Sequence, residues 1–303
     1  MLVIDPFGSM DTAFGSGPNP PSRWNAVRNF TIGAPGQRPG GLVHRLAEEV
    51  RFGLVLYKAN APDSPQQVQG TCPLLKTVLP TPLNNYAAMA ADYADENTGD
   101  ETPTGDTILQ VAANLRQTPP DNNDPILFIL ARDGEPDGCA NANPANATEQ
   151  AAANTFTESA ARTVFTKRNI RTYVVSVGSQ TSAVHLQRLA NAGLGRAANA
   201  NPAAPYRTAN DPTQLTTAIR DQIIANRIGC EFTLNGQIQD MAKACEGRVE
   251  LNRSPLTCQD ANEDWRATSP NTILLLGQAC ATIRADGNKR VNASFPCNVA
   301  SLI

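Results

Sequence analysis

Basic clusters, aromatic residues and long apolar stretches are all scarce in this chain of 303 residues. Aromatic side chains make up 5% of the sequence, charged side chains make up 17%, and the net charge is −3. A nucleic-acid-binding surface needs Lys and Arg gathered on one face, and no such run appears. No apolar stretch approaches the roughly 20 residues needed to cross a bilayer. We therefore expect no nucleic-acid partner and no transmembrane segment.

Closely spaced cysteine pairs are also missing. None of the seven cysteines forms a Cys-x-x-Cys pair, which argues against a zinc ribbon. Cys72 and Cys139 stand apart and either bridge two loops or are unrelated thiols, whereas the other five lie between Cys230 and Cys297. We favour disulfides formed in an oxidising compartment over buried free thiols. The odd count leaves one cysteine unpaired, and the connectivity stays open.

Short apolar runs alternate with amphipathic segments along residues 1–228. Strands are predicted before Asp5 and at 51–57, 74–79, 126–131, 171–178 and 206–209. Helices are predicted at 24–30, 42–50, 107–116, 149–168 and 184–193, and from the capping pair at 211–212 onward. This alternation predicts a doubly wound, mainly parallel α/β sheet with helices on both faces.

The character of the sequence changes at Gly229. The rest of the chain is rich in cysteine, with short runs such as 272–277 bounded by turns. We predict an α/β domain at 1–228 and a small, β-rich, disulfide-stapled module at 229–303. Very few residues precede Asp5, and no signal peptide is visible. A start that has lost upstream residues, including an export signal, would explain both features.

Oxygen-bearing side chains cluster in three turns of the predicted α/β domain. Asp5 ends the first apolar run and begins the turn Asp-Pro-Phe-Gly-Ser, which ends at Ser9. Thr102 lies in the turn at 99–106, with the sequence Gly-Asp-Glu-Thr-Pro-Thr-Gly-Asp. Asp133 follows another buried strand in Arg-Asp-Gly-Glu-Pro. Ligand sites in open α/β sheets lie at the carboxyl ends of the strands, where these turns are expected to meet.

The three turns resemble the metal motif, known as MIDAS, of von Willebrand factor type A domains. That family carries Asp-x-Ser-x-Ser, Gly-Gly-Thr-Pro-x-Gly and Thr-Asp-Gly-Glu-Pro. The resemblance spans nearly all of 1–228, and the tail is similar to an extension found in a group of secreted bacterial proteins with this domain. It implies that Asp5, Ser9, Thr102 and Asp133 supply the oxygen ligands of Mg²⁺ or Mn²⁺.

Two departures from the family pattern weaken the implied metal site. Phe7 replaces a serine ligand and places an apolar ring at the mouth of the site. Arg132 replaces the threonine before Asp133. Its guanidinium either reaches Asp5 or Asp133 and stands in for the cation, or points to the opposite face of the sheet through strand alternation. The pattern therefore predicts a degenerate cation site.

Several other residues have ordinary structural interpretations. Asp106 is expected to start a helix rather than bind metal, and His185 is expected to be an ordinary helix residue. Trp24 and Trp265 are expected to pack in the interior.

The resemblance implies non-catalytic, adhesion-type binding of a protein or cell-surface ligand. The alternatives are a structural or scaffold protein that has lost its metal site and, less favoured, a metal-dependent hydrolase. The sequence shows no Gly-x-Ser-x-Gly elbow, His-Glu-x-x-His helix or phosphate-cradling loop, so we expect no enzyme. The cysteines and the resemblance place the protein outside the cell, on its surface or in the periplasm. Neither the ligand nor the oligomeric state is fixed by the sequence.

Overall fold

The computed structural model describes residues 1–48, 50–59, 71–80, 83–93, 101–118, 126–226, 230–258, 264–285 and 290–302. Two compact units divide the chain between residues 225 and 226. The boundary predicted at residues 228 and 229 lies outside the described residues. None of the described helices combines the length and apolarity needed to cross a membrane.

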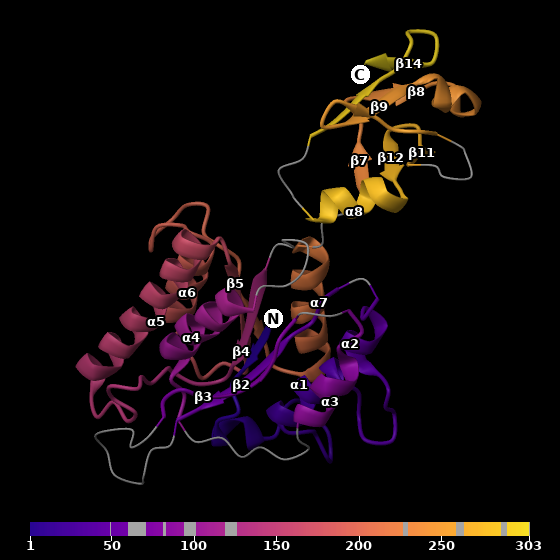
Figure 1. Ribbon diagram of the computed structural model, residues 1–303. Coiled ribbons are helices and arrows are strands. Elements are labelled where there is room, and N and C mark those ends of the chain that lie inside the picture. The colour runs from indigo at the N-terminus through magenta and orange to yellow at the C-terminus, as the bar shows by residue number, and fades with distance from the viewer. Residues whose placement is uncertain are drawn as a thin grey trace. The chain divides into compact units, whose positions relative to one another are not determined.

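The first unit is built on a six-stranded sheet in the order β3-β2-β1-β4-β5-β6 (Figure 1). The strands are β1 Leu2–Ile4, β2 Leu54–Lys58, β3 Leu74–Val78, β4 Leu127–Arg132, β5 Arg171–Val177 and β6 Arg207–Ala209. All neighbours are parallel except β3, which runs antiparallel to β2. The predicted fold class is confirmed.

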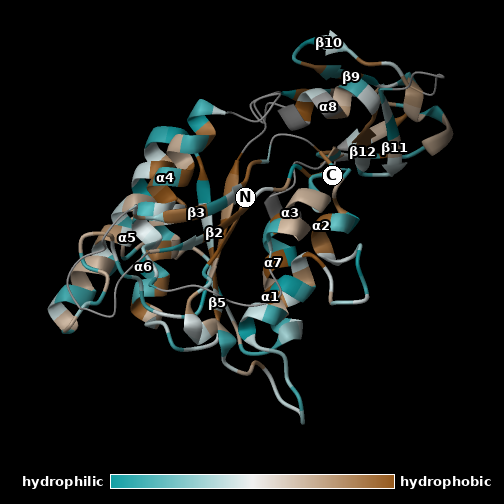
Figure 2. Cartoon of the chain, turned by 60° about the horizontal axis from the view of Figure 1, so that its bottom comes forward, coloured by the Kyte–Doolittle hydropathy of each residue, from teal (hydrophilic) through white to brown (hydrophobic). Residues whose placement is uncertain are grey.

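β1 is one of the two central strands and is buried on both faces. It pairs with β2 on one side and β4 on the other, with Leu2 opposite both Leu54 and Ile129. Its three residues are all apolar, as expected for a parallel strand covered on both faces. The strands carry most of the apolar colour in Figure 2, between helices whose surfaces are mixed.

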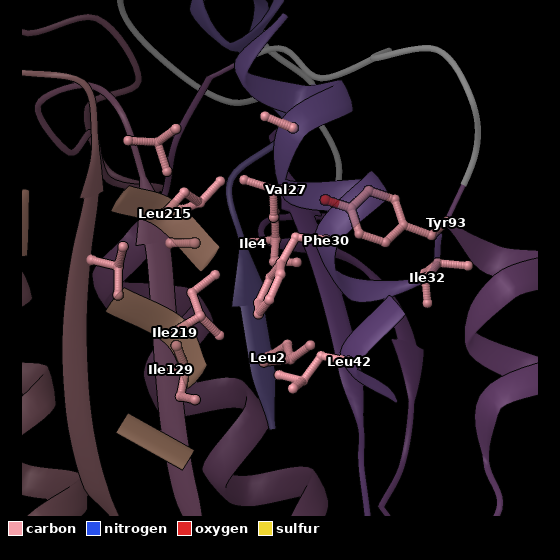
Figure 3. Close-up of a cluster of buried hydrophobic side chains, with 14 of the residues drawn as sticks. Leu2, Ile4, Val27, Phe30, Ile32, Leu42, Tyr93, Ile129, Leu215 and Ile219 are labelled. Atoms are coloured by element: carbon pink, nitrogen blue, oxygen red, sulfur yellow. The ribbon is translucent and has the colours of Figure 1, made fainter. Parts of the chain in front are cut away.

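Helices cover both faces of the sheet (Figure 1). One layer contains α1 Arg23–Thr31, α2 Gly41–Arg45, α3 Tyr86–Asp92 and α7 Pro212–Asn226; the other contains α4 Thr104–Gln117, α5 Ala147–Arg168 and α6 Ala183–Gly193. Figure 3 shows the first core, where Leu2 and Ile4 of β1 meet Phe30 of α1 and Ile219 of α7. Val3, between them in sequence, belongs to the second core. Because successive side chains of a strand point to opposite faces, β1 contributes to the cores under both helix layers.

The predicted helices are found, but α2 is shorter than expected. The predicted segment 42–50 contains a helix only as far as Arg45. The short helix α3 was not predicted. Side-chain caps define several helix starts: the Ser22 hydroxyl accepts from the Asn25 N–H at 3.1 Å, and Asn146 accepts from the N–H groups of Thr148 and Glu149.

The described residues of the second unit form three small antiparallel sheets, one α-helix and a 3-10 helix at Met241–Glu246. Its strands are β7 Glu231–Thr233, β8 Gly236–Ile238, β9 Arg248–Leu251, β10 Ser254–Pro255, β11 Trp265–Ser269, β12 Thr272–Leu275, β13 Val291–Ser294 and β14 Ala300–Leu302. The sheets are β10-β9-β13, β11-β12-β7 and β14-β8, and the helix is α8 Gly277–Ala285. Trp265 lies in a compact core with Ile273 and Leu275. The predicted β-rich character is observed, whereas α8 was not predicted.

Three disulfides confirm the interpretation of the cysteines. Cys72 is bonded to Cys139 in the first unit, while Cys230–Cys280 and Cys245–Cys258 lie in the second. Cys297 is a free, exposed thiol. The predicted odd cysteine is therefore Cys297.

Candidate ligand-binding site

The candidate site lies where the strand order of the sheet reverses. β1 and β4 lie side by side at the centre of the sheet. The strands that follow them in the chain, β2 and β5, lie on opposite outer sides of this pair. Asp5 directly follows β1, and its N–H donates to the carbonyl of Ala131 in β4 at 3.0 Å. Asp133 directly follows β4. Both carboxylates therefore flank the crevice at which doubly wound sheets bind their ligands.

Asp5 is a fully buried carboxyl group whose two oxygens differ in their contacts. Its Oδ1 accepts from the N–H of Phe7 at 2.9 Å, whereas Oδ2 has no hydrogen-bond partner among the residues that the structure describes. Burial, reinforced by the charge of Asp133, raises the pKa of Asp5 to about 8, although Arg132 acts in the opposite direction. Asp5 therefore holds its proton well above the pH at which an exposed aspartate loses it.

Asp133 is held by both of its oxygens. Oδ1 accepts from the Ser9 hydroxyl at 2.7 Å, and Oδ2 accepts from Nη1 of Arg23 at 2.8 Å. The same Nη1 also donates to Oε1 of Gln180 at 2.9 Å and contacts the Ser9 carbonyl oxygen at 3.4 Å. Arg23 is only 7% exposed. The guanidinium of Arg23 thus joins the loops that follow β1, β4 and β5.

Arg23 was not identified from the sequence. It is the first residue of α1, where side chains point toward the N-terminal end of the helix. At that end the Arg23 N–H donates to the Thr12 carbonyl at 3.0 Å, directly after the 3-10 turn that contains Ser9. A cation in the first turn opposes the helix macrodipole, so an arginine directly after the Ser22 cap was an available signal. Its partners are 110 and 157 residues away, which local pattern analysis does not detect.

Arg132 does not stand in for a cation at Asp5 or Asp133. Its guanidinium hydrogen-bonds the Gly134 carbonyl and lies 3.3 Å from Nε2 of His185. No ion pair joins Arg132 to either aspartate in the described part of the chain. It shares the face of β4 that carries Phe128 and Leu130, so the alternative based on strand alternation is the correct one.

His185 is more than an ordinary helix residue. Its Nδ1 lies 2.9 Å from Oε1 of Glu158, so the neutral tautomer with a proton on Nδ1 donates to Glu158 and accepts from Arg132 at Nε2. Burial lowers the pKa of His185 and favours this neutral form. The chain Glu158–His185–Arg132 joins α5 and α6 to the end of β4.

Thr102 is placed near the site but bonds elsewhere. Its hydroxyl donates to Oδ2 of Asp137 at 3.0 Å and lies 3.2 Å from the Glu135 carbonyl oxygen. Across the described residues, no hydrogen bond links Thr102 to Asp5, Ser9 or Asp133. The first two residues of its motif, 99 and 100, lie outside the described ranges.

A disulfide and a hydrogen bond hold the loop after β4 in place. Cys139 in this loop is bonded to Cys72, and its N–H donates to Oδ2 of Asp106 at 2.9 Å. Asp106 lies in the first turn of α4, as expected for a helix-start residue. Two independent anchors therefore hold the segment that carries Asp133.

The arrangement of these oxygens does not fit a divalent cation. Mg²⁺ requires about six oxygens near 2.1 Å. Both oxygens of Asp133 are engaged, one of them by a positive charge, and Phe7 supplies no ligand. The described residues contain no group of three or more His, Cys, Asp or Glu side chains able to hold a metal ion. Metal ligation by Asp5, Ser9, Thr102 and Asp133 stays a prediction.

Comparison with known proteins reveals distant structural likenesses. No family model matches the chain, and no curated protein matches it. The chain is similar to proximal thread matrix protein 1 from the mussel byssus, at 14% identity and a TM-score of 0.42 over 78% of this chain and 49% of that one. The form of that protein with a zinc-occupied MIDAS motif gives 16% identity and a TM-score of 0.42 over 77% and 48%.

A second similar structure is the open conformation of the pilus adhesin SpaC from Lactobacillus rhamnosus GG. It shares 14% identity and a TM-score of 0.47 over 92% of this chain and 37% of that one. The chain thus spans about half or less of the length of each of these structures. At these scores the likenesses carry no argument about function, which must come from the site itself.

Proposed function

We propose that the first unit is a non-catalytic binding module of the von Willebrand factor A type. It recognises a protein or surface ligand through what we term the sheet-end face: Asp5–Met10, Thr102, Asp133–Glu135 and Gln180–Val184. One observation carries the proposal: three loops from adjacent strands meet at the strand-order reversal and are joined there by Arg23. Such a rigid, multi-loop edge is where this architecture presents its ligand site.

A binding role is favoured over catalysis by the state of the polar groups. A hydrolase needs a nucleophile beside a free base or an electrophilic metal. Ser9 donates its hydroxyl to an aspartate that Arg23 already neutralises, and His185 is buried between Arg132 and Glu158. In the described parts of this face, no nucleophile is paired with an available base. We therefore propose that the protein is not an enzyme.

The disulfides support a location in an oxidising compartment. Cystines persist outside the cytosol, so we propose that the protein works outside the cell, on its surface or in the periplasm. A second candidate function is a structural scaffold whose metal site has been lost. Phe7 and the Arg23–Asp133 pair favour this alternative, which predicts no ligand at the sheet-end face.

The two candidates differ in the effect of a charge placed on the sheet-end face. Val184 is 61% exposed in the first turn of α6, two residues after Ser182, whose N–H donates to the Glu135 carboxylate at 2.6 Å. We expect Val184→Asp to weaken binding at least tenfold to whichever member of a panel of purified matrix proteins and cell-wall polysaccharides the parent binds. Biolayer interferometry with the full chain measures this affinity.

The matched control lies at the other end of the sheet. Leu83 is 39% exposed and follows β3, whose last residue, Val78, pairs with the first residue of β2. Leu83→Asp adds the same charge at the amino ends of the parallel strands and should leave the affinity unchanged. Equal affinities for the two variants, or a parent that binds no member of the panel, would favour the scaffold.

A further inference from the structure

We propose that Arg23 is a built-in cation that takes the place of a divalent metal ion at Asp133, so that the sheet-end face works without metal. The exclusion of metal follows from contacts within this chain alone. Its consequence for ligand recognition rests on the function proposed above.

The position of Arg23 Nη1 is that of a cation among oxygens. One carboxylate, one amide and one main-chain oxygen surround it, from Asp133 at 2.8 Å, Gln180 at 2.9 Å and Ser9 at 3.4 Å. The Ser9 hydroxyl occupies the other Asp133 oxygen. Oxygens from three loops therefore converge on a guanidinium nitrogen instead of a metal ion.

A metal ion and this guanidinium exclude each other. An ion bound to Oδ2 of Asp133 at about 2.1 Å would lie at most about 5 Å from Nη1, which is itself 2.8 Å from that oxygen. The two positive charges would share one carboxylate in a site that is almost fully buried, where screening by water is weak. A guanidinium stays charged throughout the physiological pH range, so it occupies the carboxylate permanently.

The backbone around the site is shaped to admit this side chain. At Gly178, directly after β5, an added Cβ would lie 2.8 Å from Nη2 and 3.0 Å from Cζ of Arg23. Gly178 also has a φ of +96°, a conformation that other residues rarely adopt. The main chain of the loop that carries Gln180 therefore passes directly against the guanidinium, and α1, capped by Ser22, holds the arginine from its other end.

The proposal is tested by titrating the full oxidised chain with Mn²⁺ alone and following free Mn²⁺ by electron paramagnetic resonance. We expect no binding by the parent up to 1 mM Mn²⁺, and the same for Arg23→Lys, which keeps the charge. Arg23→Met removes the charge but keeps most of the stem volume. We expect it to bind one equivalent of Mn²⁺, and adding Asp133→Asn should abolish that site.

Phe7→Ser separates the two departures from the family pattern. This variant restores the hydroxyl ligand while Arg23 remains, so we expect it to bind no Mn²⁺, whereas Phe7→Ser/Arg23→Met should bind more tightly than Arg23→Met. The proposal would be overturned if the parent or Phe7→Ser bound Mn²⁺ and if that binding were lost when Asp133→Asn was added. Absence of binding by a folded Phe7→Ser/Arg23→Met variant, checked by circular dichroism, would also overturn it. If the Arg23→Met variants do not fold, the parent and Phe7→Ser titrations decide the question.

A separate measurement tests whether ligand binding depends on metal. For a panel ligand whose affinity falls in Val184→Asp, we expect a change of less than twofold between 1 mM Mg²⁺ and EDTA. A change above tenfold would overturn metal independence but leave the binding function intact. Loss of the binding function would leave the Mn²⁺ result unaffected, because that titration contains no ligand.

Discussion

At the scale of single residues, burial of the Asp5 carboxyl group opposes its ionisation. Its folded-state pKa of about 8 is far above its ordinary value of 3.8, because burial and Asp133 disfavour the ionised form. The folded state therefore binds a proton that the unfolded state releases. The stabilisation from this proton is complete below pH 3.8 and is lost progressively as the pH rises to about 8.

Asp5→Asn should remove this pH dependence. The amide oxygen can still accept from the Phe7 N–H, and the side chain no longer ionises. Between pH 5 and pH 7, we expect the parent to lose more unfolding free energy than Asp5→Asn, by about 1.4 kcal/mol per pH unit. Urea denaturation at both pH values measures the difference. Parallel pH profiles for the two proteins would show that Asp5 titrates near its ordinary pKa.

His185 should make the opposite contribution. Protonation would set an imidazolium against Arg132, and burial already lowers the pKa of His185 below its ordinary value of 6.5. Stability from the neutral ring is present above pH 6.5 and is lost as the pH falls through the lower folded-state pKa. His185→Gln keeps an acceptor for Arg132 but does not titrate. On going from pH 7 to pH 5, we therefore expect the unfolding free energy of His185→Gln to increase relative to that of the parent.

The same urea measurements at pH 7 and pH 5 test the His185 prediction. His44→Gln is the matched control, because His44 belongs to α2 in the other helix layer, where it contacts the Tyr86 ring. If the unfolding free energy changes by the same amount in the parent and both variants on acidification, protonation of His185 beside Arg132 does not contribute to the acid response.

At the scale of elements, the Cys72–Cys139 disulfide joins the start of β3 to the loop after β4. It closes a span of 67 residues, and such a cross-link stabilises the fold mainly by restricting the unfolded chain. We expect Cys72→Ser/Cys139→Ser to lower the free energy of unfolding by about 2–4 kcal/mol, as measured by urea denaturation. Cys297→Ser removes only the free thiol and should have no effect. Equal stability of all three proteins would mean that the disulfide adds no measurable stability beyond the hydrogen bonds that hold this loop.

The elements of the α/β unit could largely be predicted because each carries its own periodicity. The runs that form β4 and β5 are continuous and apolar, and α4 presents Ile108, Val111 and Leu115 on one face. The direction of β3 could not be predicted, because an apolar run does not record which way its partner runs. α3 and α8 were missed because they are short, at seven and nine residues, and tertiary packing stabilises them.

The candidate site was predicted only in part, for the same physical reason. Asp5 and Asp133 follow apolar runs, so their place at strand ends could be predicted from local sequence. The pairing of Arg23 with Asp133 joins residues 110 positions apart and depends on how α1 packs against the sheet. Of the two alternatives predicted for Arg132, strand alternation turns its side chain to the opposite face, and the positive charge at Asp133 comes from Arg23.

At the scale of the whole molecule, the two units of the chain differ in how they are stabilised. The first unit has an extensive core on each face of a six-stranded sheet and a single disulfide. The second has a small core around Trp265 and two disulfides, which close spans of 50 and 13 residues. Together these cross-links contribute about 7 kcal/mol in the chain-entropy treatment. A core in a unit of this size supplies only about 3–5 kcal/mol.

Reduction should therefore unfold the second unit and spare the first. The chain has two tryptophans, both buried: Trp24 packs against Tyr93 in the first unit and Trp265 against Phe295 in the second. In dithiothreitol at 25 °C, we expect the emission of Trp24→Phe, which reports on Trp265, to shift to the red. The emission of Trp265→Phe, which reports on Trp24 in the first unit, should not shift to the red until urea is added. Reduction of Cys72–Cys139 removes about 4 kcal/mol, and a domain of this size stays folded after that loss. A red shift of both signals would mean that the first unit also fails to stay folded once Cys72–Cys139 is reduced, and the sheet-end face would then depend on oxidising conditions as much as the second unit does.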